Sequence, residues 1–401
     1  MGIIIGIGQT KPQVPYDQFY GIEWDVTVSN PKTKRIGKLE LHASLPVQSL
    51  MRRCVLRDNG EVAYYLDAND STKKEGGAPA KLDGTDGQVM VEIPAFYVKF
   101  ETEGNKRRCL MSRHALPGFT KWDKLYISAY EASVRGAEKK LSSISVDGGL
   151  PSSSFTLSEA RTMARSRGGV NWNCYTYQAH KELFWLFAVE YATFNSQDAF
   201  DASLDPQGCR QGGLGAGVSD VSTWGGLGYV PIVKCGVTNQ LGNHTGIVKV
   251  QVTSSVATNA TSYRGVENPF GHIGKLIDGM KMAIIAGNTG FYVYSSPRDY
   301  GVAGVSACRL IANASGNYGY VRSIHFGESG DITPEAYGGS SSTYFCDEGS
   351  LGVENLEGAE SVLSVGGIAN SGASAGLCSM ISRSEATLRL SFHGTRLCYL
   401  P

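Results

Sequence analysis

Glycine is the feature that most limits how this chain can fold. It accounts for 50 of the 401 residues and does not recur at a fixed interval. Because glycine weakens helix and strand interiors and readily adopts left-handed backbone conformations, this abundance predicts many turns and irregular loops. Hydrophobic residues still make up 42% of the chain, which is enough for a sizeable core. We therefore expect a loop-rich globular protein with short regular elements.

The charge balance excludes two classes of partner. Basic and acidic residues number 37 each, so the formal net charge is zero, and charged residues make up only 18% of the chain. Nothing in this balance attracts the protein to nucleic acid or to an anionic membrane surface. The sequence has no apolar run long enough for a membrane helix and no recognisable signal peptide. We expect synthesis in the cytoplasm without membrane insertion.

Cysteine and histidine spacing does not indicate a metal site. The number of cysteines, nine, is odd, and no two of them have the spacing of a metal knuckle. This pattern predicts buried free thiols in a protein assembled in a reducing compartment. The seven histidines show no metal-ligand spacing either, and His272 is expected to be a core histidine bonded to the backbone. Asp67, Asn69 and Asp70 could bind calcium weakly, although a solvated turn is favoured. We expect no cofactor and no bound metal.

Two helices are predicted in the first half of the chain. Thr156 and Glu159 have the spacing of a capping box, in which each side chain satisfies a backbone N–H of the other, and that helix should extend to about Arg167. A second helix, at about 175–194, has too many apolar positions for a surface helix and should be largely buried.

The rest of the chain predicts short strands joined by long loops, an α+β pattern. Residues 1–35 are rich in proline and aromatic residues and indicate an extended arm. A polar, turn-rich stretch at 67–87 suggests a boundary between a β-rich attachment module (1–85) and a larger domain (86–401). Strands are expected at 38–41, 54–56, 62–66 (after a hairpin turn at 58–60), 89–100, 125–129, 248–252, 282–286, 291–294 and near 321 and 344, and surface loops at 201–228, 252–262, 313–319, 338–343 and 351–361.

The stretch from Ala386 to His393 alternates between apolar and polar residues. This period of two predicts a strand with Leu388, Leu390 and Phe392 on a buried face. The opposite face would expose four chemically different side chains, which are Thr387, Arg389, Ser391 and His393. A glycine-rich turn at 366–376 precedes it, so the region is typical of a display surface.

Several stretches together resemble one protein family. Residues 263–279 read Tyr-Arg-Gly-Val-Glu-Asn-Pro-Phe-Gly-His-Ile-Gly-Lys-Leu-Ile-Asp-Gly. They resemble the signature of phage tail-fibre variable proteins, which diversity-generating retroelements diversify. Residues 183–197, with Val-Glu-Tyr-Ala at 189–192, are similar to the helix of the C-type lectin-like domain of these proteins, a fold also similar to formylglycine-generating enzymes. The chain departs from the family at Gly274 and Leu276, where members commonly carry aromatic residues, and in having less Asn, Tyr and Trp in its variable region.

The resemblance implies a receptor-binding protein in the virion tail, with a C-type lectin-like domain that presents a variable region at about 360–393. Its partners would be a host cell-surface protein or glycan and, through the N-terminal module, other phage tail proteins, and it would assemble as a homotrimer. The implied contact residues are Asn370, Ser371, Ser374, Ser379, Ile381, Arg383, Thr387, Arg389, Ser391 and His393. Of these, Arg389 could grip a carboxylate or phosphate with two parallel hydrogen bonds.

The same family diversifies its variable region by mutating adenines. Randomising both adenines of an AAC codon gives Asn, Ser, Thr, Tyr, His or Arg among others, but never Met or Glu. Thr387, Arg389, Ser391 and His393 fit that set, whereas Met380 and Glu385 do not and should be fixed.

Two other functions remain open from the sequence. A baseplate or fibre-adaptor protein could use the same fold with an invariant C-terminal face. An enzyme of the formylglycine-generating or carbohydrate-cleaving class is also conceivable, and Gly372–Gly376 formally matches the hydrolase pattern Gly-x-Ser-x-Gly. That pattern requires a preceding strand, a following helix and downstream Asp or Glu and His partners. The context here does not supply them, so we expect no enzymatic activity.

Overall fold

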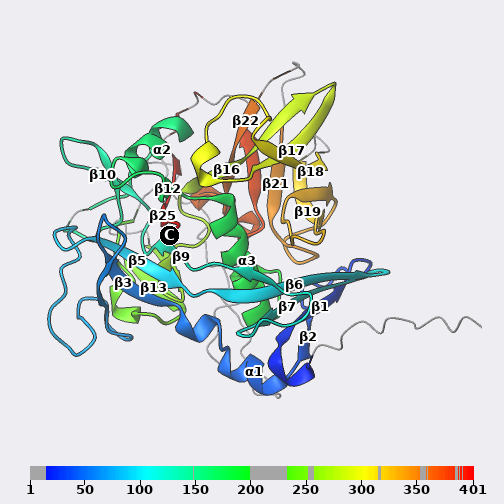
Figure 1. The fold of residues 1–401 in the computed structure, drawn as a ribbon, viewed down its shortest axis with the longest axis horizontal. Coiled ribbons are helices and arrows are strands. Elements are labelled where there is room, and N and C mark those ends of the chain that lie inside the picture. Colours follow the sequence, from blue (N-terminus) through cyan, green and yellow to red (C-terminus); the bar gives the residue numbers. More distant parts are fainter. Residues whose placement is uncertain are drawn as a thin grey trace, which may run out of the picture.

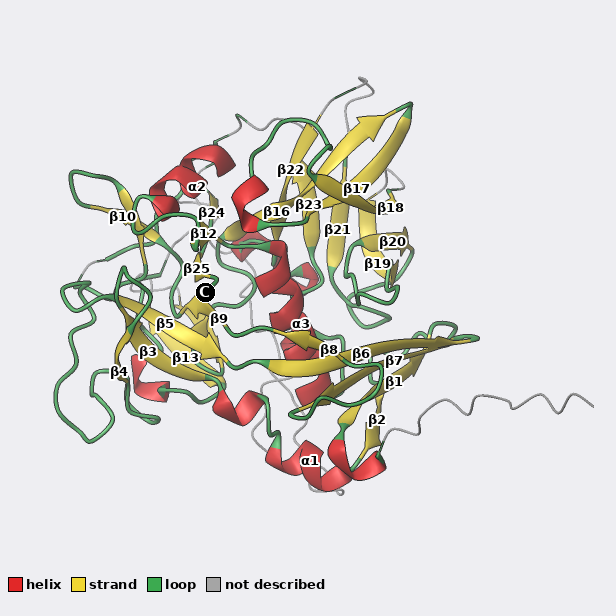
Figure 2. Ribbon diagram, viewed as in Figure 1, coloured by secondary structure: helices red, strands yellow, loops and turns green. Residues whose placement is uncertain are grey.

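The structure is a computed structural model that describes residues 15–147, 149–198, 233–251, 257–314, 318–352, 358, 360–383, 387, 389–390 and 392–401. Strands predominate over helices in this part of the chain (Figure 2). The α-helices are α1 (Leu39–Ser44), α2 (Leu157–Arg165) and α3 (Tyr177–Tyr191). The molecule therefore has the expected α+β class, with a strong β character.

A six-stranded sheet joins the beginning, middle and end of the chain, in the order β12-β25-β9-β5-β3-β4. Its strands are β3 (Arg52–Leu56), β4 (Val62–Tyr65), β5 (Gln88–Ile93), β9 (Leu125–Ser128), β12 (Trp172–Cys174) and β25 (Leu397–Tyr399). The expected hairpin turn at 58–60 connects β3 and β4. Gly60 has φ +86°, and a Cβ there would collide with the Tyr399 hydroxyl, so the turn requires glycine.

A five-stranded sheet lies beside it, in the order β2-β1-β7-β6-β8. Its strands are β1 (Tyr20–Asp25), β2 (Lys34–Gly37), β6 (Phe96–Glu103), β7 (Lys106–Ser112) and β8 (Thr120–Trp122). β1 is an interior strand that pairs with both β2 and β7. The arm expected over 1–35 is therefore wrong for 20–25, while 1–14 lie outside the described residues.

The second half of the chain builds the largest sheet, in the order β18-β17-β16-β22-β23-β21-β19-β20, with β24 paired to β16. Its strands are β16 (Gly274–Ile285), β17 (Asn288–Tyr294), β18 (Cys308–Asn313), β19 (Tyr318–Ile324), β20 (Pro334–Tyr337), β21 (Glu348–Leu351), β22 (Glu360–Val365), β23 (Met380–Arg383) and β24 (His393–Gly394). Two small sheets complete the fold, namely β10 (Ser133–Arg135) with β11 (Lys140–Ser142), and β13 (Gly246–Gln251), β14 (Ala257–Tyr263) and β15 (Val266–Glu267).

Helix α3 runs through the middle of the molecule, with sheets on several sides (Figure 1). All of its residues except Gln178 are buried, as the predicted burial of this segment requires. The Thr176 hydroxyl accepts a hydrogen bond from the Ala179 N–H and caps the helix, and Ala192 ends it in a left-handed conformation. The prediction of a buried helix is confirmed, with narrower bounds than 175–194.

Burial gives Glu182 on this helix an unusual protonation state. Its side chain is 2% exposed, and its Oε1 accepts a hydrogen bond from Gln178 Nε2 at 2.8 Å. Burial raises the pKa of Glu182 from 4.5 to about 8. Between these two values the folded protein holds a proton that the unfolded chain releases, so this group lowers stability as pH rises through that window.

Glu182→Gln should remove this pH-dependent penalty, because glutamine keeps the acceptor without a titratable group. We expect the variant to exceed the wild type in free energy of unfolding by about 2–3 kcal/mol at pH 7.5, and to match it near pH 4.5. Urea unfolding of both proteins at the two pH values measures this. A difference that is the same at both pH values would contradict it.

The capping box predicted for α2 is present. The Thr156 N–H donates to Glu159 Oε2 at 2.9 Å, and the Glu159 N–H donates to the Thr156 hydroxyl at 3.2 Å. The helix ends at Arg165, two residues before the expected end. This prediction is confirmed. The motif could be recognised from the sequence because its two partners lie within four residues of each other.

Other local predictions were wrong. Residues 39–44 form α1 and not the strand expected at 38–41, residues 257–263 form β14 and not a loop, and Tyr344 lies outside any strand. The loop expected at 201–228 lies outside the described residues. The sheets also do not separate at residue 85, since β3 pairs with β5 and β1 with β7 across that position. No helix among the described residues is long and apolar enough to cross a membrane.

Candidate functional site

The described residues of the C-terminal segment do not form the strand predicted for 386–393. Among residues 387, 389–390 and 392–393, Thr387 lies in a turn, Arg389 and Leu390 have no regular structure, and only His393 enters a strand, as the first residue of β24. The carbonyl groups of Leu390 and His393 accept from the Ser154 N–H, each at 3.2 Å. A loop residue therefore bonds to carbonyl groups that a strand would offer to a neighbouring strand. The alternating sequence alone does not ensure a strand here.

His393 was predicted on the exposed face and is in fact 5% exposed. It pairs with Gly274 of β16, and a Cβ at Gly274 would lie 2.9 Å from the His393 ring. Glycine at position 274, which has no side chain, makes room for the buried histidine. His393 is therefore part of the scaffold and is not available for ligand contact in this structure.

The serine residues of the predicted patch are mostly structural. Ser374 and Ser379 are 7% and 2% exposed. Ser379 donates to the Glu348 carbonyl at 2.8 Å, and Ser371 accepts from the Ile368 N–H at 3.0 Å. Ile381 is half-buried in β23. The side chains of Asn370 and Arg383, and all of Ser391, lie outside the described residues.

Two predicted contact residues, Thr387 and Arg389, are exposed. The Arg389 side chain is 53% exposed and makes a two-pronged ion pair with Glu159, with Nη1 2.6 Å from Oε2 and Nη2 2.7 Å from Oε1. Glu159 also belongs to the capping box of α2, and the Thr156 backbone N–H together with Arg389 lowers its pKa. The arginine is thus placed over the N-terminal turn of a rigid helix.

A shallow groove of about 340 Å³ adjoins this ion pair. Arg389, Glu159 and Ser158 provide polar walls, and Phe155 and Met163 provide apolar surface. Val134 and Lys139, from β10 and the turn that follows it, close the other side together with Thr162. The sequence identified Arg389 and predicted α2 but did not place them in one site, because Glu159 and Arg389 are 230 residues apart in the chain.

The signature at 263–279 forms the scaffold behind this region. Arg264 makes a two-pronged ion pair with the buried Glu190 of α3, with Nη2 2.6 Å from Oε1. Asp278 accepts two hydrogen bonds from Arg161 of α2, at 2.6 and 3.0 Å. The first contact joins the turn between β14 and β15 to α3, and the second joins β16 to α2.

His272 is a core histidine, as predicted. Its Nε2 accepts from the Val233 N–H at 2.6 Å, so Nδ1 carries the proton that it donates to Glu131 at 2.5 Å. Lys275 is fully buried, and its Nζ lies 2.9 Å from Glu131 Oε1. Burial alone would raise the pKa of Glu131, but the Lys275 ammonium holds it well below its usual range. This cluster is a network of hydrogen bonds and an ion pair inside the core.

The described residues contain no cluster of three or more His, Cys, Asp or Glu side chains placed to hold a metal ion. The Asp67 carboxylate accepts from the backbone N–H groups of Asn69 and Asp70, at 2.9 and 3.1 Å, as expected for a turn. Eight cysteines are free thiols, and Cys209 lies outside the described residues. Ser374, the serine of the hydrolase-like pattern, donates to the Ser371 carbonyl at 2.8 Å.

A scan of protein-family models finds no match to the chain, and a search of curated proteins finds none either.

Proposed function

We propose that this chain is a receptor-binding protein of a phage tail fibre, with a C-type lectin-like domain whose C-terminal segment contacts a host-surface protein or glycan. The observation that carries the proposal is the position of Arg389, which is half-exposed at the wall of a groove on the rigid helix α2. Loops held on a stable framework are typical of binding surfaces, because the framework keeps its fold while the loop residues change.

Among the described side chains, the contact set of this proposal is smaller than the one predicted from sequence. Thr387 and Arg389 remain, together with the α2 residues Ser158, Glu159 and Thr162 that line the groove. Asn370, Arg383 and Ser391 stay predicted contacts, since their side chains lie outside the described residues. The buried residues His393, Ser374 and Ser379 are excluded. Trimeric assembly, attachment through the N-terminal part and location in the virion tail belong to the proposal, and light scattering of the purified chain tests the first of them.

Removal of the exposed side chains tests the binding surface. The double variant Thr387→Ala/Arg389→Ala should reduce binding of the purified protein to host cells at least tenfold. Its melting temperature should stay unchanged, because an exposed ion pair contributes only about 0–1 kcal/mol to stability. Arg57→Ala is the matched control, since Arg57 also pairs with a glutamate on the surface (3.7 Å). Equal binding by the double variant and the control would refute the assignment.

Amplicon sequencing of the gene in a growing phage or lysogen population tests diversification separately. Changes confined to codons between about 360 and 393, at adenines of a template copy, would establish a diversified receptor binder. A uniform 3′ region would favour a fixed adhesin or a baseplate adaptor.

A further inference from the structure

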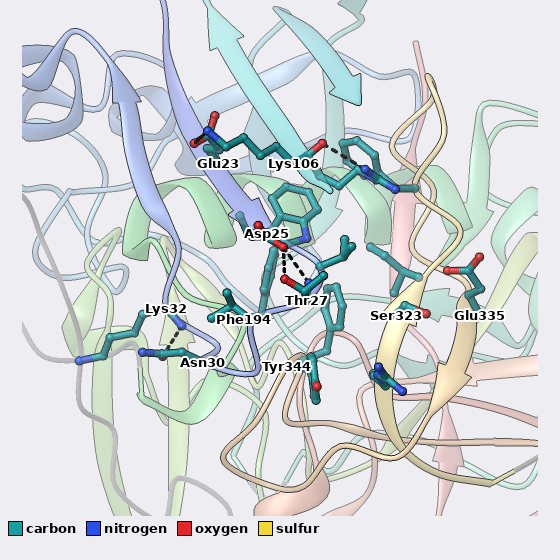
Figure 3. A pocket seen from close by; sticks show the side chains of 18 of the residues that line it. Glu23, Asp25, Thr27, Asn30, Lys32, Lys106, Phe194, Ser323, Glu335 and Tyr344 are labelled. Atoms are coloured by element: carbon teal, nitrogen blue, oxygen red, sulfur yellow. Dashed lines mark hydrogen bonds and ion pairs between the residues drawn. The ribbon is translucent and has the colours of Figure 1, made fainter. Parts of the chain in front are cut away.

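An aromatic cleft lies away from the C-terminal groove (Figure 3). It has a volume of about 580 Å³ and separates the end of β1 and the loop after it from the β19–β20 hairpin. In Figure 3, Asn30 and Lys32 stand on one side, Ser323 and Glu335 on the other, and Phe194 and Tyr344 between them. The cleft therefore lies between the five-stranded sheet and the largest sheet.

Aromatic rings form the inner wall of this cleft. Trp24 lies 5.1 Å from Phe194 and 5.0 Å from Phe326, measured between ring centroids, and Phe194 lies 4.5 Å from Phe345. Trp24 and Tyr344 are half-buried, so part of each ring faces the cleft. Packed rings of this kind are rigid and present flat apolar faces without further loss of side-chain entropy.

The rim of the cleft is rich in cations. Lys32, Lys34 and Arg322 are exposed, and no ion pair joins any of them to a carboxylate within the described part of the chain. The Arg322 guanidinium lies 5.7 Å from the centre of the Tyr344 ring. Its planar fork therefore stands beside an aromatic face at the entrance.

Two acidic side chains of the cleft, Glu23 and Asp25, bond to neighbouring groups. Glu23 pairs with Arg108 at 2.7 Å and with Lys106 at 3.5 Å. Asp25 accepts from both the N–H and the hydroxyl of Thr27, at 2.9 and 2.6 Å. Glu335, which also lines the cleft, is exposed. The cleft is lined by five basic side chains (Lys32, Lys34, Lys106, Arg107 and Arg322) and three acidic ones (Glu23, Asp25 and Glu335), so its surplus of positive charge can attract an anion.

A second cavity of about 570 Å³ extends the cleft. The two cavities share Arg107, Ile324, Phe326 and Glu335 as lining residues, and the second adds Arg309 and His325. The second cavity also contains Glu328 and Asp331, so the surplus of positive charge lies in the aromatic cleft and the second cavity offers space for a neighbouring unit. A ligand of more than one unit, with its anionic groups in the aromatic cleft, fits this arrangement.

From this geometry we infer that the groove binds an acidic oligosaccharide, a chain of sugar units that carry carboxylates. The apolar face of a sugar ring would stack on Trp24 or Tyr344, and a carboxylate would accept two parallel hydrogen bonds from Arg322. Lys32 and Lys34 would hold neighbouring carboxylates. This site is separate from the C-terminal groove, and its binding does not require the proposed receptor function to be correct.

Calorimetry with the full chain tests the inference, with oligogalacturonic acid of four to six units as the probe. The matched neutral probe is the same oligomer with its carboxylates methyl-esterified. We expect the acid to bind at least tenfold more tightly than the ester. Equal affinity for both would overturn the inference, as would equal affinity for the acid and for inorganic polyphosphate, which carries charge without sugar rings.

Variants locate the binding. Arg322→Ala should weaken binding of the acid at least tenfold, and Arg322→Lys should weaken it less, because lysine keeps the charge without the fork. Arg298→Ala, which removes an exposed arginine outside the groove, should have no effect. Arg389→Ala should also have none. Loss of acid binding in Arg389→Ala with retention in Arg322→Ala would place the ligand in the C-terminal groove and refute the inference.

Discussion

Trp185→Ala is expected to lower the free energy of unfolding by about 3–5 kcal/mol, as large-to-small substitutions of buried aromatic residues do. Trp185 is fully buried on α3, and its ring contacts Trp24, Phe100 and Phe326 with centroid distances of 5.3–5.7 Å. Its Nε1–H donates to the Gly330 carbonyl at 2.7 Å. The substitution removes the packing and also leaves that carbonyl without its partner.

Urea unfolding with linear extrapolation measures this loss. Trp185→Phe is the control that separates the two contributions, since it keeps a ring and removes only the N–H, and it should cost about 1–2 kcal/mol. A loss below about 1 kcal/mol for the alanine variant would show that this aromatic cluster does not stabilise the fold. Because Trp24 packs on Trp185, the alanine variant should also bind less of any ligand that occupies the aromatic cleft.

Glu190→Gln is expected to cost about 3 kcal/mol or more, since it removes one partner of a buried ion pair. Glu190 has no exposed surface, and Arg264 is 12% exposed. The Tyr263 hydroxyl donates to Glu190 Oε2 at 3.0 Å, so one carboxylate serves two adjacent signature residues. Glutamine keeps the shape but offers only one oxygen and no charge to the buried guanidinium.

Glu61→Gln provides the matched control. Glu61 pairs with Arg57 at 3.7 Å on the surface, where its side chain is 69% exposed, and this loss should change stability by less than about 0.5 kcal/mol. Thermal unfolding of both variants beside the wild type makes the comparison. Similar melting temperatures for the two variants would mean that the buried pair contributes no more than the exposed one.

Features with both partners close in sequence were predictable. The capping box of α2 needs only Thr156 and Glu159, and the burial of α3 follows from its apolar content. The hairpin at 58–60 likewise depends on three adjacent residues. In each case the physical cause acts within a few residues, so no knowledge of the rest of the fold was needed.

Features that depend on distant partners were not predictable. β1 follows a proline-rich stretch, and its role as an interior strand depends on β7, which begins at Lys106. Among the described positions of 386–393, only His393 lies in a strand, and the Ser154 N–H bonds to the carbonyl groups of Leu390 and His393. An alternation with a period of two residues indicates which residues could share a face. It does not indicate whether a neighbouring strand exists.

The candidate sites show the same limit. Arg389 was identified from its own neighbourhood, whereas its partner Glu159 comes from a helix far away in the chain. The aromatic cleft draws residues from four separate stretches, between Glu23 and Phe345, and none of these stretches carries a recognisable motif. Such a site exists only after the sheets have assembled, so its residues carry no joint signal in the sequence.

The position of β25 has a consequence for biosynthesis. This strand, Leu397–Tyr399, lies between β12 and β9 inside the six-stranded sheet. The growing polypeptide therefore cannot complete that sheet until the ribosome has passed residue 399. Until then β9 and β12 lack the strand that pairs with both of them. Premature stop codons just upstream would leave an open edge that another copy's strand could enter, so they should yield aggregates and not slightly shortened, working molecules.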